Sequence, residues 1–187
     1  MRAMKRPGGF LSRLAVPAPL MTLLMVALLL AALPGATLQA HGAHVHGQGL
    51  LQVALDNGDL HLRLQVPGMD VVGFEHAPET DSDRRAVEDA VTRLEDPSSL
   101  VQLPAEAGCS VTGTRVDSPL LDEQHGDDHA DFLVVHEFEC SDPAALEHLD
   151  VLAGSTLGLE RVDVQIISER GQGHTRLQHG NRRVLMP

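Results

Sequence analysis

Hydrophobic and polar residues alternate with a period of two along much of the chain, which is typical of strands with one buried face. The clearest example is the run 60–66, where apolar residues occupy every second position: Leu60, Leu62, Leu64 and Val66. A second apolar run, 50–55, precedes it, and the two are separated by Asp56-Asn57-Gly58-Asp59. Asn57-Gly58 is a strong signal for a tight hairpin turn because both residues tolerate positive φ. The polar residue His61 is expected to face solvent.

A second pair of strand-like runs, 109–116 and 131–140, flanks the acidic loop 119–130. If these runs pair antiparallel with Cys109 opposite Cys140, the period of two places one set of residues on a core face: Cys109, Val111, Phe132, Val134, Phe138 and Cys140. His136 falls on the same face and is expected to be a hydrogen-bonded core histidine. Further strands are predicted at 161–168, 174–178 and 183–186.

Helical spacing occurs in two segments. The first begins at Asp81, is capped by Thr80 or Ser82, and stops at Asp96-Pro97. Its apolar stripe consists of Ala86, Val87, Ala90, Val91 and Leu94. The second is predicted to start at Asp142-Pro143 and to end near Gly154, with Leu146, Leu149 and Leu152 as its inner face. The order of elements predicts an α+β fold, mainly an antiparallel sheet of hairpins with about two helices packed on one face.

Residues 1–40 differ from the rest of the chain. They combine four basic residues and no acidic one with an apolar run, 20–33, which is broken by Pro34-Gly35. This pattern predicts a secretory signal peptide over 1–40, with cleavage near Ala40, and a single domain over 41–187. An uncleaved membrane anchor is the alternative.

Charge and cysteine content further narrow the range of possible functions. Without residues 1–40 the chain has 10 Arg and 26 Asp plus Glu, a net charge of −16. Such a surface repels nucleic acid and anionic lipid and attracts cations. An even pair of cysteines in an exported protein predicts a disulfide between Cys109 and Cys140. Two thiolate metal ligands are the alternative, which the absence of CxxC spacing disfavours.

Histidine is the main chemical signal. All 11 histidines follow residue 40, and they concentrate at 41–46 and 125–136. Neutral imidazoles two residues apart, as at His44 and His46, are common zinc or copper ligands. The candidate metal ligands are His41, His44, His46, His76, His125, Asp127, Asp128 and His129. Zinc usually takes four ligands, so either an acidic residue completes each cluster or the N-terminal segment folds back towards the loop.

The chain resembles the ZrgA-like zinc-regulated periplasmic proteins of Gram-negative bacteria. The resemblance rests on His41-Gly-Ala-His-Val-His-Gly, on Gly73-Phe-Glu-His-Ala-Pro78, on the acidic loop before His136-Glu-Phe-Glu-Cys140, and on the closing region 164–178. It implies zinc binding in the periplasm and cooperation with an ABC-type zinc uptake system. The loop departs from the family pattern because it is shorter and keeps only His125 and His129, which argues against a high-capacity zinc buffer.

The sequence thus predicts a periplasmic zinc-binding protein that supports zinc uptake as the accessory of an ABC-type transporter, and not an enzyme. It contains no GxSxG, glycine-rich phosphate loop or HExxH motif. Two alternatives remain. One is a structural envelope module with incidental histidines. The other is a copper enzyme with an N-terminal histidine chelate, which would need cleavage directly after Ala40. Zinc, copper and nickel all remain candidate ions.

Overall fold

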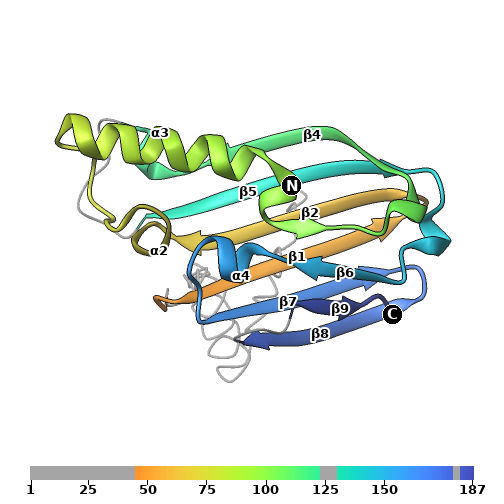
Figure 1. Ribbon diagram of the computed structural model, residues 1–187. Helices are drawn as coiled ribbons and strands as arrows, with labels where there is room; N and C mark the ends of the chain where they lie inside the picture. The colour runs from red at the N-terminus through yellow and green to blue at the C-terminus, as the bar shows by residue number, and fades with distance from the viewer. Residues whose placement is uncertain (1–44, 123–129, 179–181) are drawn as a thin grey trace, which may run out of the picture. The chain divides into compact units, whose positions relative to one another are not determined.

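A computed structural model describes residues 45–122, 130–178 and 182–187. The described strands form a six-stranded sheet, in the order β4-β5-β2-β1-β7-β8, and a three-stranded sheet, in the order β3-β6-β9 (Figure 1). In chain order the elements are β1 (Gln48–Asp56), β2 (Asp59–Pro67), α2 (Gly68–Val72), α3 (Asp81–Glu95), β3 (Val101–Gln102), β4 (Cys109–Asp117), β5 (Asp131–Cys140), β6 (His148–Val151), α4 (Ala153–Thr156), β7 (Arg161–Ser168), β8 (Gly171–Gln178) and β9 (Arg183–Leu185).

The hairpin β1–β2 lies at the centre of the large sheet, as its alternation predicts. Its two-residue turn has φ of 50° at Asn57 and 95° at Gly58, the left-handed conformations that a tight hairpin turn requires. The residues predicted to face inward on β2 are buried, while His61 is exposed. The turn prediction and the direction of each β2 side chain are therefore confirmed.

The large sheet is antiparallel except at one pair. β5 pairs antiparallel with β2 and β4, and β8 pairs antiparallel with β7. β7 instead runs parallel to β1, with Leu51 opposite Val164. Parallel neighbours require a crossover connection, and here the chain between β1 and β7 contains every element from β2 to α4. The sheet is thus mainly, but not wholly, a set of hairpins.

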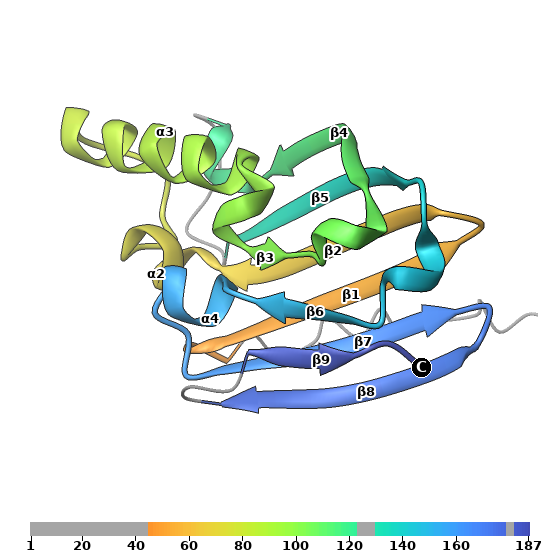
Figure 2. The ribbon, with the colours of Figure 1, turned by 45° about the vertical axis from the view of Figure 1, so that its right-hand side comes forward.

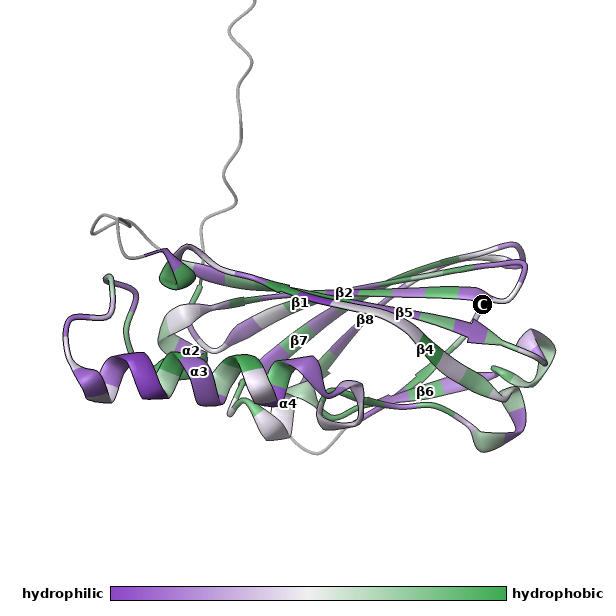
Figure 3. Cartoon of the chain, turned by 90° about the horizontal axis from the view of Figure 1, so that it is seen from above, coloured by the Kyte–Doolittle hydropathy of each residue, from purple (hydrophilic) through white to green (hydrophobic). Residues whose placement is uncertain are grey.

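One face of the large sheet is covered. Figures 1 and 2 show α2, α3 and the small sheet on the same side, and in Figure 3 no helix or strand of the described residues covers the opposite side. The core between the layers includes Phe132, Leu94, Leu149 and Val164. Since most alternating strands bury only one side chain in two, this arrangement explains why their polar residues face solvent.

Helix α3 begins and ends where the sequence predicts. Thr80 is the N-cap, and its hydroxyl and the Asp83 carboxylate each accept a hydrogen bond from the other residue's backbone N–H, which forms a capping box. The buried residues of the helix are Val87, Ala90 and Leu94. The helix is followed by Asp96-Pro97, as expected.

The prediction of a second helix from Asp142-Pro143 to Gly154 is wrong. Asp142-Pro143 begins only a 3-10 turn, Pro143–Ala145, which is followed by strand β6. Helix α4 is limited to four residues, Ala153–Thr156, so Gly154 lies inside it rather than at its end. The leucine spacing fits a helix, but Leu149 and Val151 also alternate with polar residues. Pairing of β6 with both β3 and β9 satisfies its backbone and selects the strand.

The pairing of β4 with β5 is confirmed, with one exception on the predicted core face. A β-bulge lies between Val111 and Gly113, and Val111 is 53% exposed. Val111 lies before the bulge, opposite Phe138 on edge strand β4, and was wrongly predicted as core. The extra residue reverses the alternation after it, so Thr114 and Val116 lie opposite the buried His136 and Val134. Phe132, Val134, Phe138 and Cys140 are buried as predicted.

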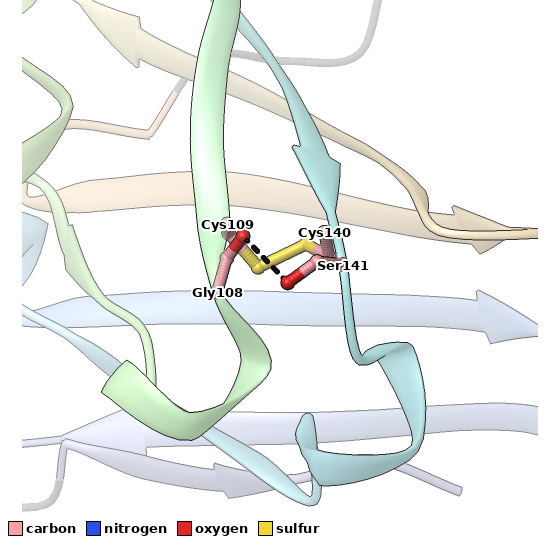
Figure 4. The surroundings of a disulfide bond; sticks show 4 residues. All are labelled: Gly108, Cys109, Cys140 and Ser141. Atoms are coloured by element: carbon pink, nitrogen blue, oxygen red, sulfur yellow. Dashed lines mark hydrogen bonds between the residues drawn. A yellow bond between two sulfur atoms is a disulfide. The ribbon is translucent and has the colours of Figure 1, made fainter.

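The predicted disulfide is present. Cys109 lies opposite Cys140 in the β4–β5 register, and the two form a disulfide (Figure 4). Beside it, the Ser141 hydroxyl donates a hydrogen bond of 3.4 Å to the Gly108 carbonyl oxygen. Across the described ranges, no helix is long and apolar enough to span a membrane.

Candidate metal centre

Three segments that carry or adjoin predicted ligands leave the large sheet at the same end. β1 starts there, β2 ends there and β5 starts there, because Leu50 lies opposite Gln65 and Pro67 lies opposite Asp131. The Gly68 N–H donates a 2.6 Å hydrogen bond to the Ala130 carbonyl oxygen and joins two of these segments directly. Strand order therefore brings together parts of the chain that are up to about 85 residues apart.

The segment just before β1 is held in place by its backbone. The Gly47 N–H donates to both carboxylate oxygens of Asp70 in α2, at 2.9 and 2.8 Å. The Gly47 carbonyl accepts a hydrogen bond of 3.0 Å from the Arg161 N–H at the start of β7. Gly47 has φ of 76°, a left-handed conformation that favours glycine. These bonds fix the backbone next to His46.

His46 lies beside Glu75. Its Nδ1 is 3.8 Å from Glu75 Oε1, and the two side chains are 54% and 13% exposed, respectively. The separation exceeds the usual hydrogen-bond range. An imidazole and a largely buried carboxylate therefore face each other at the end of the sheet.

His76, also predicted as a ligand, has local contacts. Its ring stacks on Phe74 with centroids 4.9 Å apart. Its Nδ1 lies 2.9 Å from the Ala77 carbonyl oxygen. Because a carbonyl only accepts, Nδ1 carries the proton in this contact and Nε2 keeps its lone pair. The residue that contacts His46 is thus Glu75 and not its neighbour His76.

The other predicted ligands lie outside the described residues: His41, His44, His125, Asp127, Asp128 and His129. The chain on either side of the loop is well packed, since Leu120 and Ala130 are both buried. Within the described ranges, no group of three or more His, Cys, Asp or Glu side chains is arranged to hold a metal ion. The described part of the centre is therefore the His46–Glu75 pair.

Asp70 and Glu75 contact the segment around His46, and the sequence prediction did not single them out. Glu75 precedes His76 in a Glu-His pair, and that adjacency was the available signal. Asp70 is one of 26 acidic residues, and nothing in its local sequence distinguishes it. Its role depends on a contact with Gly47, 23 positions away.

Other histidines are placed away from this end or have different partners. His136 is buried, as expected, and its Nδ1 lies 3.0 Å from the Thr114 hydroxyl. Burial lowers the pKa of His136. His61 and His174 lie on strand surfaces beside Glu137 and Asp163, at 3.6 and 3.5 Å.

Comparison with protein families gives a match to a family described as ZrgA family zinc uptake protein, over residues 43–186. The matched range includes every described element of both sheets. No curated protein matches the chain.

Proposed function

The chain belongs to the ZrgA family of zinc uptake proteins, and from this premise we propose that it binds Zn²⁺ in the periplasm and supports its import by an ABC-type transporter. Zinc is the cargo in this proposal. The protein acts as an accessory carrier rather than as an enzyme.

The observation that carries the proposal is the convergence of ligand-bearing segments at one end of the large sheet. His46 and Glu75 are already adjacent there, and the acidic loop that contains His125 and His129 begins after Asp122 and returns at Ala130. Imidazole nitrogen and carboxylate oxygen are both common zinc ligands. The remaining predicted ligands, His41 and His44, precede His46 by only a few residues.

Export to the periplasm is supported by two features. Residues 1–40 have the composition of a signal peptide, and the Cys109–Cys140 disulfide suits an oxidising compartment. Loss of the signal peptide leaves a net charge of −16. A field of that sign raises the local concentration of cations and speeds their capture.

A growth experiment tests the proposed function. A Gram-negative strain lacking its own copy of this gene is grown with a zinc chelator and complemented with the wild type, with His44→Ala plus His46→Ala, or with His61→Ala. His61 is the matched control because it is an exposed histidine on the sheet surface. The wild type and the His61 variant should restore growth, and the double variant should not. Equal growth with the double variant would contradict the proposal, provided that added zinc rescues every strain.

A further inference from the structure

We propose that Glu75 is a direct zinc ligand, paired with His46 in a site that Asp70 preorganises. This inference rests on the proposed zinc-binding function and adds a carboxylate that the histidine pattern does not reveal. It also assigns a positioning role to Asp70.

The separation of the two side chains fits a shared ion. Two ligand atoms about 2.1 Å from a tetrahedral zinc ion lie about 3.4 Å apart. His46 Nδ1 and Glu75 Oε1 are 3.8 Å apart, so a small rotation of the exposed imidazole brings both atoms to coordination distance. A direct hydrogen bond would hold them closer than this.

The backbone beside His46 is held by hydrogen bonds to Asp70 and β7. The Gly47 N–H is held by both oxygens of Asp70, at 2.9 and 2.8 Å, and its carbonyl is held by β7. A Cβ on Gly47 would meet Glu160 Cγ at 3.1 Å, and φ of 76° there adds strain for any other residue. Metal binding therefore requires little ordering of His46, which reduces the conformational entropy lost on binding.

Glu75 is favoured over His76 by its contacts. Glu75 Oε1 lies 3.8 Å from His46 Nδ1. His76 instead stacks on Phe74 and donates to Ala77.

The ligand types indicate the class of ion. One imidazole nitrogen and one carboxylate oxygen suit a borderline divalent cation, whereas Cu(I) prefers thiolate and thioether sulfur. His46 and Glu75 fill two of the four positions of a tetrahedral site. Water can occupy the other two positions.

The first test compares Glu75→Gln with Glu79→Gln. Glutamine keeps the shape of each side chain and removes its charge. Glu79 is the control because it is an exposed acidic residue in the same segment, between α2 and α3. Competition titration of the purified protein with Zn²⁺ and a chromophoric chelator should show affinity reduced tenfold or more for the Glu75 variant and unchanged for the Glu79 variant. Equal affinities of the wild type and the Glu75 variant would overturn the inference and leave a simple ion pair.

The second test detects contact with the metal directly. Glu75→Cys places a thiolate where the carboxylate lies, and a thiolate bound to Co²⁺ produces an intense near-ultraviolet charge-transfer band. The band should appear with Glu75→Cys and not with Glu79→Cys. Its absence, in protein whose Cys109–Cys140 disulfide is intact, would show that position 75 does not touch the ion. Failure of the wild type to bind Zn²⁺ or Co²⁺ would instead reject the proposed function.

Asp70 is tested as a positioning residue by Asp70→Ala and Asp70→Asn. Alanine removes both acceptors for the Gly47 N–H, whereas asparagine keeps one. Zinc affinity should fall with alanine and recover in large part with asparagine, while the Co²⁺ spectrum of the asparagine variant stays that of the wild type. Equal loss in both variants would show that charge, and not the position of His46, accounts for the effect.

Discussion

At the residue scale, His136 is a buried side chain, 2% exposed and within hydrogen-bond distance of Thr114. The period of two placed it on the core face and placed His61 in solvent. It gave no information about Asp70 or Glu75, because their roles depend on contacts with residues that are more than 20 positions away. Local alternation determines which way a side chain points but not what it meets.

The buried histidine makes stability depend on pH. Burial lowers the pKa of His136 in the folded protein, although the nearby Leu94 backbone and the Asp96 carboxylate act in the opposite direction. Below pH about 6.5 the unfolded chain therefore takes up this proton more readily than the folded one, so acid favours unfolding. Between pH 7.5 and 5.5, the urea midpoint of the wild type should fall more steeply than that of His136→Gln. Parallel curves for the two proteins would contradict a depressed pKa at this position.

At the scale of elements, locally encoded features were predictable. The Asn57-Gly58 turn, the start and end of α3, and the pairing of Cys109 with Cys140 were all correct. Features that depend on pairing between distant segments were not predicted. Strand β6 was predicted as helix because its pairing with β3 and β9 is non-local, and the parallel contact of β7 with β1 has no local signal. The β-bulge between Val111 and Gly113 was also not predicted, because the predicted pairing of these strands assumed an unbroken register.

The disulfide ties edge strand β4 to β5 and closes a loop with a sequence separation of 31. By the chain-entropy model, a closed loop of this size stabilises the folded state by about 3–4 kcal/mol. Cys109→Ser plus Cys140→Ser should lower the free energy of unfolding by about that amount in urea denaturation. Wild-type protein treated with a reductant is the control and should lose a similar amount. An unchanged midpoint in both samples would show that the cross-link does not stabilise the fold.

At the scale of the whole molecule, the strand order matters most for function. The sequence identified the N-terminal histidines, the Glu-His connector and the acidic loop separately, and left open whether they meet. The order β5-β2-β1 brings the start of β1, the end of β2 and the start of β5 to one end of the sheet. This convergence follows from pairing between segments far apart in sequence, so alternation alone did not predict it.

The N-terminal histidines should dominate tight binding because the backbone beside His46 is already fixed by Asp70 and β7. His125 and His129 lie outside the described residues, so no such fixed backbone is described beside them. His44→Ala plus His46→Ala should therefore weaken the tightest site tenfold or more. His125→Ala plus His129→Ala should mainly reduce the number of weaker ions bound.

Isothermal titration of the chelator-stripped protein with Zn²⁺ tests the central claim most directly. It is performed on the wild type and both double variants at pH 7.5 and 5.5. The account predicts tight binding by the wild type at pH 7.5, its loss in the N-terminal double variant, and weaker binding at pH 5.5, because zinc requires the neutral imidazole. Wild-type affinity that is equal at the two pH values, or tight binding abolished only in the loop double variant, would contradict it.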